Sequence, residues 1–453
     1  MDETRTLAKW VVETGYEQLP QGLPEELRVA LLDAVCAGFV GTMQPAGRAM
    51  LKLVTALGGT PEASIINQSF KIDAGRAALA NGTLIGTFES EPLTGTHGAG
   101  TALPAALAIA QRDHLDGRSF ITAVALGYEV SSRLSSTAVG LEEKRGFHNP
   151  GTQGPFAAAA AVGKLLHFDH ATMVNAFGVA GSGAAGLLEF AWEGADTKRT
   201  HLGRASQLGL EAALLAQNGL VGPATVLEGP YGYFNAFSLP TDVSKVVAGL
   251  GERWASRPPR HKYYATHVTH QAVVHAIQEF KKEHPFDPKS LTKISILGTP
   301  RIMEGRHSVR TPSTVMGGQY SLPFTAAVAI CRDMSDPLVY DDQAIADPVI
   351  RDIATRIELI ENEGADKAGS FSGELTLEFG GERHVIQSKP VPGSAEMPFT
   401  WDDACAKFYR FTQRVLPKER AKSVIDAIAN LHDVKDMGVI AEALAAAPVT
   451  AAS

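Results

Sequence analysis

The stretch Phe156-Ala157-Ala158-Ala159-Ala160-Ala161-Val162, with its continuation to Leu166, has the apolar period of a helix built from small residues. The same period recurs in four further stretches: 103–111, 120–134, 173–190 and 205–218. Pro24 opens an earlier helix whose apolar residues again fall on one face. Because alanine and leucine fill most of these apolar positions, the helices can pack closely on one another. No strand-like alternation of any length interrupts about the first 260 residues, so they are predicted to be all helical.

The pattern changes after Phe286-Asp287-Pro288. Alternation with period 2 predicts strands at 294–296 and 357–360, and the run 375–386, with Gly380-Gly381 at its centre, predicts a β-hairpin. From Trp401 the helical period returns. The predicted fold is therefore mostly α, a large all-helical domain (1–269 and 399–453) with a smaller inserted α+β domain (270–398).

The bulk properties exclude several classes of protein. A chain of 453 residues exceeds what one hydrophobic core usually supports, which agrees with two domains. The net charge of −8 argues against nucleic acid as a partner, since a phosphate-binding face normally needs a basic excess. The longest apolar runs are too short to cross a membrane, and the first residues lack the pattern of a secretory signal. Three scattered cysteines (Cys36, Cys331 and Cys405) suit neither a disulfide framework nor a metal site, so we expect a cytoplasmic protein.

Two motifs invite a cofactor assignment and do not sustain it. The run 181–186, Gly-Ser-Gly-Ala-Ala-Gly, fits a dinucleotide-binding pattern, but a helix precedes it and no acidic residue follows at the required distance. His267 and His270 could begin a metal site, yet no third ligand is apparent, and Lys262 would oppose a cation nearby. We therefore predict neither a nicotinamide cofactor nor a metal.

Four loops place cations and imidazoles among small residues: Thr94-Gly95-Thr96-His97-Gly98-Ala99-Gly100, Gly146-Phe147-His148-Asn149-Pro150, Thr197-Lys198-Arg199-Thr200-His201-Leu202-Gly203 and His261-Lys262-Tyr263-Tyr264-Ala265-Thr266-His267. Lysine is rarely buried unpaired, yet Lys198 and Lys262 adjoin segments of core character. A pocket with two lysines and several histidines suits a small molecule that carries carboxylates. The partner predicted from the residues is thus a small polycarboxylate.

The chemistry of these groups can be assigned if the four loops converge. Lys198 and Lys262 could clamp carboxylates or stabilise the enediolate-like charge formed when a proton leaves the neighbouring carbon. His97 and His148 are candidates for general acid and base, because imidazole titrates near neutrality. Thr94, Asn149 and Tyr320 could orient the substrate. The alternative is that each histidine caps a helix and each lysine reaches solvent; four such loops together favour the catalytic interpretation. An unpaired Lys198 should then be replaceable with little effect on folding.

These loops belong to an ordered series of motifs: His97-Gly98-Ala99-Gly100 with Leu103-Pro104, Gly127-Tyr128-Glu129-Val130 with Arg133-Leu134, Gly146-Phe147-His148, Lys198 with His201 and Gly203, Lys262 with His267, Gln319-Tyr320-Ser321-Leu322-Pro323-Phe324, and Pro392-Gly393-Ser394 before Lys407-Phe408. In this series the chain resembles the 2-methylcitrate dehydratase family, the MmgE/PrpD group. That family also contains cis-aconitate decarboxylases and iminodisuccinate epimerases. The resemblance runs over nearly the whole length.

The resemblance implies a homodimeric enzyme without metal or cofactor, with its active site in the cleft between a helical and a smaller α+β domain. It implies functional roles for His97, His148, Lys198, Lys262 and His267. Relatives usually carry an Asp-Phe-Asp-Asp stretch shortly before the first histidine, whereas this chain has Thr87-Phe88-Glu89-Ser90-Glu91. If that aspartate handles a proton in relatives, Glu89 or Glu91 replaces it here, or the chemistry has changed.

The main hypothesis is a metal-independent lyase that removes water or carbon dioxide from a small di- or tricarboxylate. In it His97, His148, Lys198 and Lys262 are catalytic, and the substrate is bound by a second set: Glu89, Glu91, Thr94, His267 and Tyr320. One alternative is an isomerase or epimerase that returns the abstracted proton to the other face of a dicarboxylate such as iminodisuccinate. The other is a non-catalytic carboxylate-binding homologue.

Overall fold

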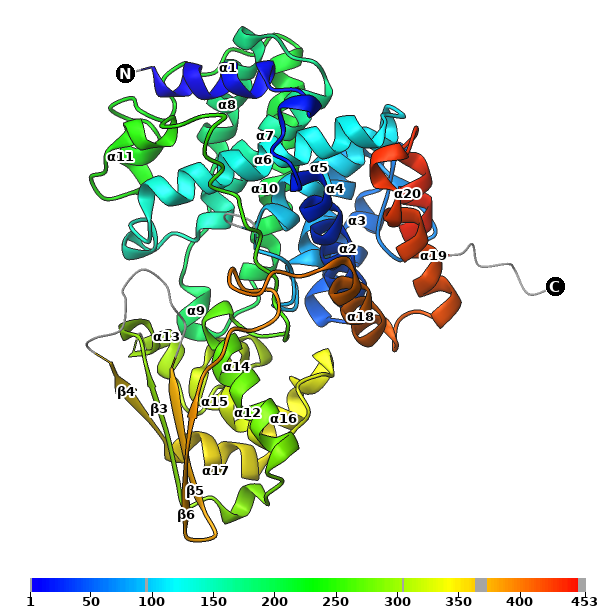
Figure 1. Ribbon diagram of the computed structural model, residues 1–453. Coiled ribbons are helices and arrows are strands. Elements are labelled where there is room, and N and C mark those ends of the chain that lie inside the picture. The colour runs from blue at the N-terminus through cyan, green and yellow to red at the C-terminus, as the bar shows by residue number, and fades with distance from the viewer. Residues whose placement is uncertain (1, 94–96, 304, 363–372, 447–453) are drawn as a thin grey trace, which may run out of the picture. The chain divides into compact units, whose positions relative to one another are not determined.

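The computed structural model describes residues 2–93, 97–303, 305–362 and 373–446, and the chain divides into two compact units (Figure 1). The helical unit comprises Met1–Leu188, Lys198–Arg260 and Thr400–Ser453, and the second unit comprises Glu189–Thr197 and His261–Phe399. The fold is mostly helical, as the sequence predicts. The units divide the chain at Arg260 and Phe399, where the predicted boundaries are 269 and 398, and the short segment 189–197 groups with the second unit.

Five helices form the centre of the helical unit: α4 (Ala74–Ile85), α5 (Gly98–Arg112), α6 (Gly117–Ala138), α7 (Asn149–Leu165) and α10 (Lys198–Gln217). Helix α10 packs on α4, α5 and α7, and α7 also packs on α5 and α6. Small residues allow this packing. A Cβ added to Gly203 of α10 would lie 2.1 Å from the carbonyl oxygen of Leu79 in α4, so a glycine is required where these two helices touch. The alanines of the 156–162 stretch are fully buried in α7.

The remaining elements of the helical unit are α1 (Glu3–Glu13), α2 (Leu23–Gly41), α3 (Pro45–Leu57), α8 (His170–Gly183), α11 (Tyr233–Phe237), α18 (Trp401–Thr412), α19 (Lys418–Ala429), α20 (Gly438–Leu444), the two-residue strands β1 (Ala63–Ser64) and β2 (Lys71–Ile72), and the 3-10 turns Tyr16–Gln18, Glu143–Arg145, Val243–Val246 and Leu431–Asp433. The sequence prediction of one helix over 173–190 is wrong, because α8 ends at Gly183. The residues that follow run as a loop past His148, and Gly186 has a φ of +144° that favours glycine.

The second unit contains a four-stranded sheet in the order β4-β3-β5-β6, with β3 (Lys293–Gly298) parallel to β4 (Ile357–Glu361) and antiparallel to β5 (Glu374–Phe379). Strands β5 and β6 (Glu382–Gln387) form the predicted hairpin, whose turn residues Gly380 and Gly381 both have positive φ. The other elements are α9 (Phe190–Glu193), α12 (Gln271–Glu283), α13 (Gly305–Ser308), α14 (Val315–Tyr320), α15 (Leu322–Cys331), α16 (Asp342–Ala346), α17 (Pro348–Arg356) and the 3-10 turns Val268–His270, Pro288–Ser290, Pro300–Met303 and Pro337–Val339. Helix α12 packs on β5, β6 and α15.

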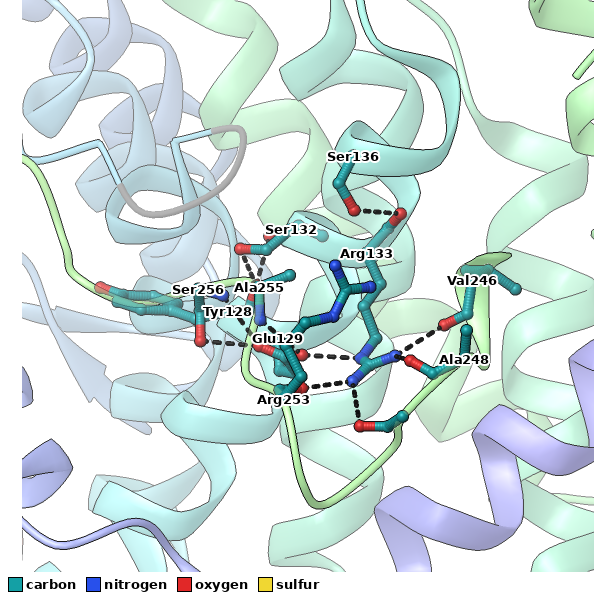
Figure 2. Close-up of polar contacts among 12 residues, drawn as sticks. Tyr128, Glu129, Ser132, Arg133, Ser136, Val246, Ala248, Arg253, Ala255 and Ser256 are labelled. Atoms are coloured by element: carbon teal, nitrogen blue, oxygen red, sulfur yellow. Dashed lines mark hydrogen bonds and ion pairs between the residues drawn. The ribbon is translucent and has the colours of Figure 1, made fainter. Parts of the chain in front are cut away.

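A buried ion pair fixes a long loop of the helical unit to α6 (Figure 2). The Glu129 carboxylate lies 2.6 Å from the Arg133 guanidinium, and neither side chain is more than 1% exposed. Glu129 also accepts hydrogen bonds from the backbone N–H groups of Ala255 and Ser256, and Arg133 donates to four backbone carbonyls between residues 246 and 253. The pair therefore provides hydrogen-bond partners for backbone groups of the loop between residues 246 and 256. This loop continues to Arg260, whose backbone pairs with that of Leu93.

No single helix of the described residues is both long and apolar enough to cross a membrane. Helices α2 and α3 reach the required composition only when they are taken together, and they meet at an angle of 87°.

Candidate active site

The segment Thr87–Glu91 is buried directly after α4. Thr87, Glu89 and Glu91 are each at most 1% exposed. The Lys407 ammonium of α18 donates a hydrogen bond of 2.8 Å to the Ser90 carbonyl and forms an ion pair of 2.5 Å with Asp33 of α2. Both members of this ion pair are buried as well. Lys407, which is itself paired with Asp33, thus anchors the backbone of the segment. The side chains of Glu89 and Glu91 contact other residues.

Glu89 forms an ion pair with Lys198, the first residue of α10. Neither side chain is more than 1% exposed, so the charges face each other with little water between them. Glu89 has a φ of +55°, a left-handed backbone conformation that is uncommon for a residue with a side chain. The expectation that Lys198 is an unpaired cation is wrong, because sequence reasoning had no means to place Glu89 beside it.

Glu91 orients His97. The Glu91 Oε1 atom lies 2.7 Å from Nδ1 of His97, and the His97 side chain is 17% exposed while that of Glu91 is fully buried. His97 has a φ of +58° and immediately precedes α5, where Gly98 lies so close to the Tyr128 ring that an added Cβ would be 2.5 Å from it. A carboxylate at Nδ1 favours the Nδ1–H tautomer, so Nε2 is the nitrogen that can exchange a proton.

His148 lies between His97 and His201. The ring centroids of His97 and His148 are 6.3 Å apart, and the Nδ1 atoms of His148 and His201 are 2.9 Å apart. His148 is 6% exposed and its backbone N–H donates to the carbonyl of Gly186. His201 follows Lys198 by one helical turn on α10, and burial together with the Lys198 charge lowers the pKa of His201 to about 4.

The helical unit thus brings five predicted site residues into one series. Glu89 pairs with Lys198, His201 connects Lys198 with His148, and His97 joins His148 to Glu91. Such a series contains a fixed cation, two carboxylates and three imidazoles, each of which uses Nδ1 within the protein. The arrangement can take a proton from a bound molecule at one imidazole and return it at another.

The second unit holds the other predicted residues. Lys262 is 1% exposed, and its neighbour His261 donates its backbone N–H to the carbonyl of Gly393. The rings of His267 and Tyr320 lie 4.8 Å apart, between centroids. His267 also behaves as the alternative interpretation supposed, because its Nδ1 accepts from the backbone N–H of Thr269 and caps a 3-10 turn. Thr94 lies outside the described residues.

A third imidazole joins His267 and His270 where sequence reasoning found none. The ligand atoms of His267, His270 and His307 all lie within 4.8 Å of one another, so a metal ion is conceivable there. Both ring nitrogens of His307 are already engaged, since Nδ1 lies 3.1 Å from the Tyr320 carbonyl and Nε2 accepts from the Arg306 guanidinium. A cation would have to displace Arg306, so the chemistry of this set disfavours a metal. The absence of a metal and of any cofactor stays a prediction.

Comparison with known proteins identifies the family. The MmgE/PrpD N-terminal domain matches residues 5–245 and the MmgE/PrpD C-terminal domain matches residues 264–433, so the chain belongs to the MmgE/PrpD family. The chain is 25% identical to a cis-aconitate decarboxylase of Aspergillus terreus, over 97% of this chain and 95% of that protein. It is 24% identical to a cis-aconitate decarboxylase-like protein of Aspergillus oryzae (96% and 95% covered) and 25% identical to the human cis-aconitate decarboxylase (90% and 88% covered).

Sequence reasoning missed the parts played by His201 and His307. His201 stands in a motif with Lys198, and its spacing of three residues on a helix could have shown that both side chains share one face. His307 carries no such signal, because it comes from a short helix 40 residues after His267.

Proposed function

We propose that the protein is a metal-independent lyase that acts on a small di- or tricarboxylate, of the cis-aconitate decarboxylase or 2-methylcitrate dehydratase type. The observation that carries the proposal is the pair of neighbouring imidazoles, His97 and His148, each held through Nδ1, in one series with the buried Lys198. The full-length similarity to proteins named cis-aconitate decarboxylase supports the same class of reaction.

In a dehydration, one imidazole takes the proton from the carbon beside a carboxylate, and the other gives a proton to the departing hydroxyl, which leaves as water. In a decarboxylation, carbon dioxide leaves and its electron pair stays on the carbon, which then takes a proton from the protonated imidazole. Both reactions place negative charge on a carboxylate-stabilised carbanion. The Lys198 ammonium stabilises that charge at short range, because little water screens it.

Residues of the second unit take part in the same proposal. A buried Lys262 can hold a second substrate carboxylate, and His267 with Tyr320 can orient it by hydrogen bonds. Lys262→Met should then raise KM for a polycarboxylate, while the helical unit keeps its fold. Neither the cytoplasmic location nor the homodimer expected from the family has been observed, and both stay proposals, testable by fractionation and by light scattering.

One experiment separates the lyase from its alternatives. The protein is incubated in deuterated water with 2-methylcitrate, citrate, cis-aconitate or iminodisuccinate, and each sample is followed by proton NMR, with His148→Gln as the inactive control. Formation of a new alkene, or loss of a carboxylate as carbon dioxide, is the expected result. Deuterium exchange with inversion of configuration would identify an isomerase instead. Saturable binding of these acids without any turnover would identify a non-catalytic carboxylate-binding protein and overturn the lyase proposal.

A further inference from the structure

The contact between His148 and His201 constrains the proton positions of both rings. Two Nδ1 atoms 2.9 Å apart can share a hydrogen bond only if one of them carries the proton and the other offers its lone pair. The two histidines therefore cannot choose their tautomers independently. The protonation state of Nδ1 in one ring therefore determines which nitrogen of the other ring carries the proton.

The local packing fixes this contact. The His148 backbone donates to the Gly186 carbonyl at 3.0 Å, and an added Cβ at Gly186 would lie 3.4 Å from Nδ1 of His201. An added Cβ at Gly151, in the first turn of α7, would lie 2.2 Å from the Ala185 carbonyl oxygen. The loop after α8 is thus closely packed against both histidines. On α10 the next residue, Leu202, packs against the glycines of α5 and the end of α4, which sets the rotation of the helix that carries His201.

The charges around the pair favour one direction of the hydrogen bond once His148 takes up a proton. The ionisable groups near the two rings include His97 at the start of α5, whose ring centroid lies 6.3 Å from that of His148, and Lys198 on α10, whose charge acts on His201. Burial and Lys198 keep the pKa of His201 near 4, so His201 is neutral near pH 7. A neutral ring can accept at Nδ1, whereas a protonated His148 must donate from both of its nitrogens.

We propose that His201 is a positioning residue, which accepts a hydrogen bond from Nδ1 of His148 and so keeps Nε2 of His148 available to exchange a proton with the substrate. The inference rests on the proposed role of His148 as acid or base. His201 contacts Nδ1 of His148, just as Glu91 contacts Nδ1 of His97. The two imidazoles differ in one respect, because the partner of His97 is a carboxylate and that of His148 is a neutral ring.

Two substitutions of His201 separate positioning from packing. His201→Asn places an amide oxygen close to the former Nδ1 and can still accept the hydrogen bond, whereas His201→Leu cannot. We expect His201→Leu to lower kcat by about 10- to 100-fold, the usual cost when the partner that orients a functional histidine is removed, with little change in KM. His201→Asn should recover most of the loss. The matched control is His114→Leu, which removes an exposed imidazole of the same unit.

The tautomer of His148 can be measured independently of any activity assay. Long-range proton–nitrogen NMR of the ligand-free protein, labelled with nitrogen-15 in histidine, is compared with His148→Gln to assign His148. The inference expects the Nδ1–H tautomer for His148, retained in His201→Asn and mixed in His201→Leu. An unchanged His148 tautomer in His201→Leu would overturn the inference even if the protein is an active lyase. The expected NMR result in a protein that turns over no polycarboxylate would refute the proposed function alone.

Discussion

Replacement of Lys198 by alanine should cost both stability and catalysis, and the structure sets the size of each. Glu89 and Lys198 are both at most 1% exposed, so the substitution leaves a carboxylate without its cation in surroundings with little water. Removal of one member of a buried ion pair typically costs about 3–5 kcal/mol. Total stability of a domain is about 5–15 kcal/mol, so the variant should fold but unfold at much lower urea. This expectation replaces the small effect predicted for an unpaired lysine.

A double-mutant cycle isolates the pair. Glu89→Gln together with Lys198→Ala removes both charges, and we expect the double variant to regain at least about 2 kcal/mol relative to the sum of the single losses. Stability is measured by urea unfolding at fixed protein concentration, followed by circular dichroism and tryptophan fluorescence. The loss of kcat/KM should remain near 10²–10³-fold in the double variant, because the cation is still absent. Lys198→Arg should restore activity only in part, since a planar guanidinium differs from a compact ammonium.

Additive effects of the two substitutions on the free energy of unfolding would contradict this expectation. If the free energies of the two single variants simply add, Glu89 and Lys198 do not depend on each other, and the series from Glu89 to Glu91 loses its first link. Wild-type turnover in a folded Lys198→Ala protein would remove Lys198 from the catalytic residues.

Four further outcomes follow from the site and the fold. Glu91→Gln should lower turnover by about 10²-fold or more, because the carboxylate that orients its imidazole is lost; full activity would show that the glutamate has not inherited the role of the missing aspartate. Arg133→Met should lower the free energy of unfolding in urea by about 3–5 kcal/mol, because it breaks a buried ion pair. The control Arg118→Met, whose ion pair is exposed, should lower it by at most about 1 kcal/mol. Equal losses would contradict a stabilising role for the buried Glu129–Arg133 pair. Burial lowers the pKa of His270 from 6.5 to about 3, so the folded state binds fewer protons than the unfolded state between these values. Its contribution to stability is complete above pH 6.5 and is lost as the pH falls toward 3; His270→Gln should flatten the fall in stability between pH 6 and pH 4, and an unchanged slope would assign it to other groups. Prolonged treatment with a strong chelator should leave the rate unchanged, whereas a loss that one particular metal restores would overturn the metal-free prediction.

Periodicity was sufficient to predict the long central helices of the helical unit and the strands of the sheet. The predicted stretches 103–111 and 120–134 lie within observed helices, 156–166 and 205–218 each extend one residue beyond one, and the hairpin follows from Gly380-Gly381. The exception is the end of α8, where a run of small residues satisfies the helical period and also permits a turn at Gly186. The local sequence pattern cannot distinguish a continued helix from a turn here. The turn is determined by the close packing of the loop against α7, a tertiary contact.

The site was less accessible from sequence, because its residues act in pairs. His97, His148 and Lys198 could be singled out, since small neighbours and family motifs mark them. Their partners could not. Glu89 pairs with a lysine more than 100 positions away, and His201 approaches His148 only after two helices have packed. Those pairings decide which groups are charged and which nitrogen is available, and they depend on tertiary contacts that no spacing rule encodes.

The hydrogen bond from Lys407 to Ser90 joins residues 317 positions apart and has a consequence for synthesis. A ribosome makes Ser90 317 residues before Lys407, which pairs with Asp33 and anchors the Glu89–Glu91 segment. Until Lys407 has emerged, its ion pair with Asp33 cannot form, and the loop that carries both glutamates lacks this anchor. Termination before α18 should therefore yield a chain that lacks activity, because the segment that carries both glutamates never gains its anchor.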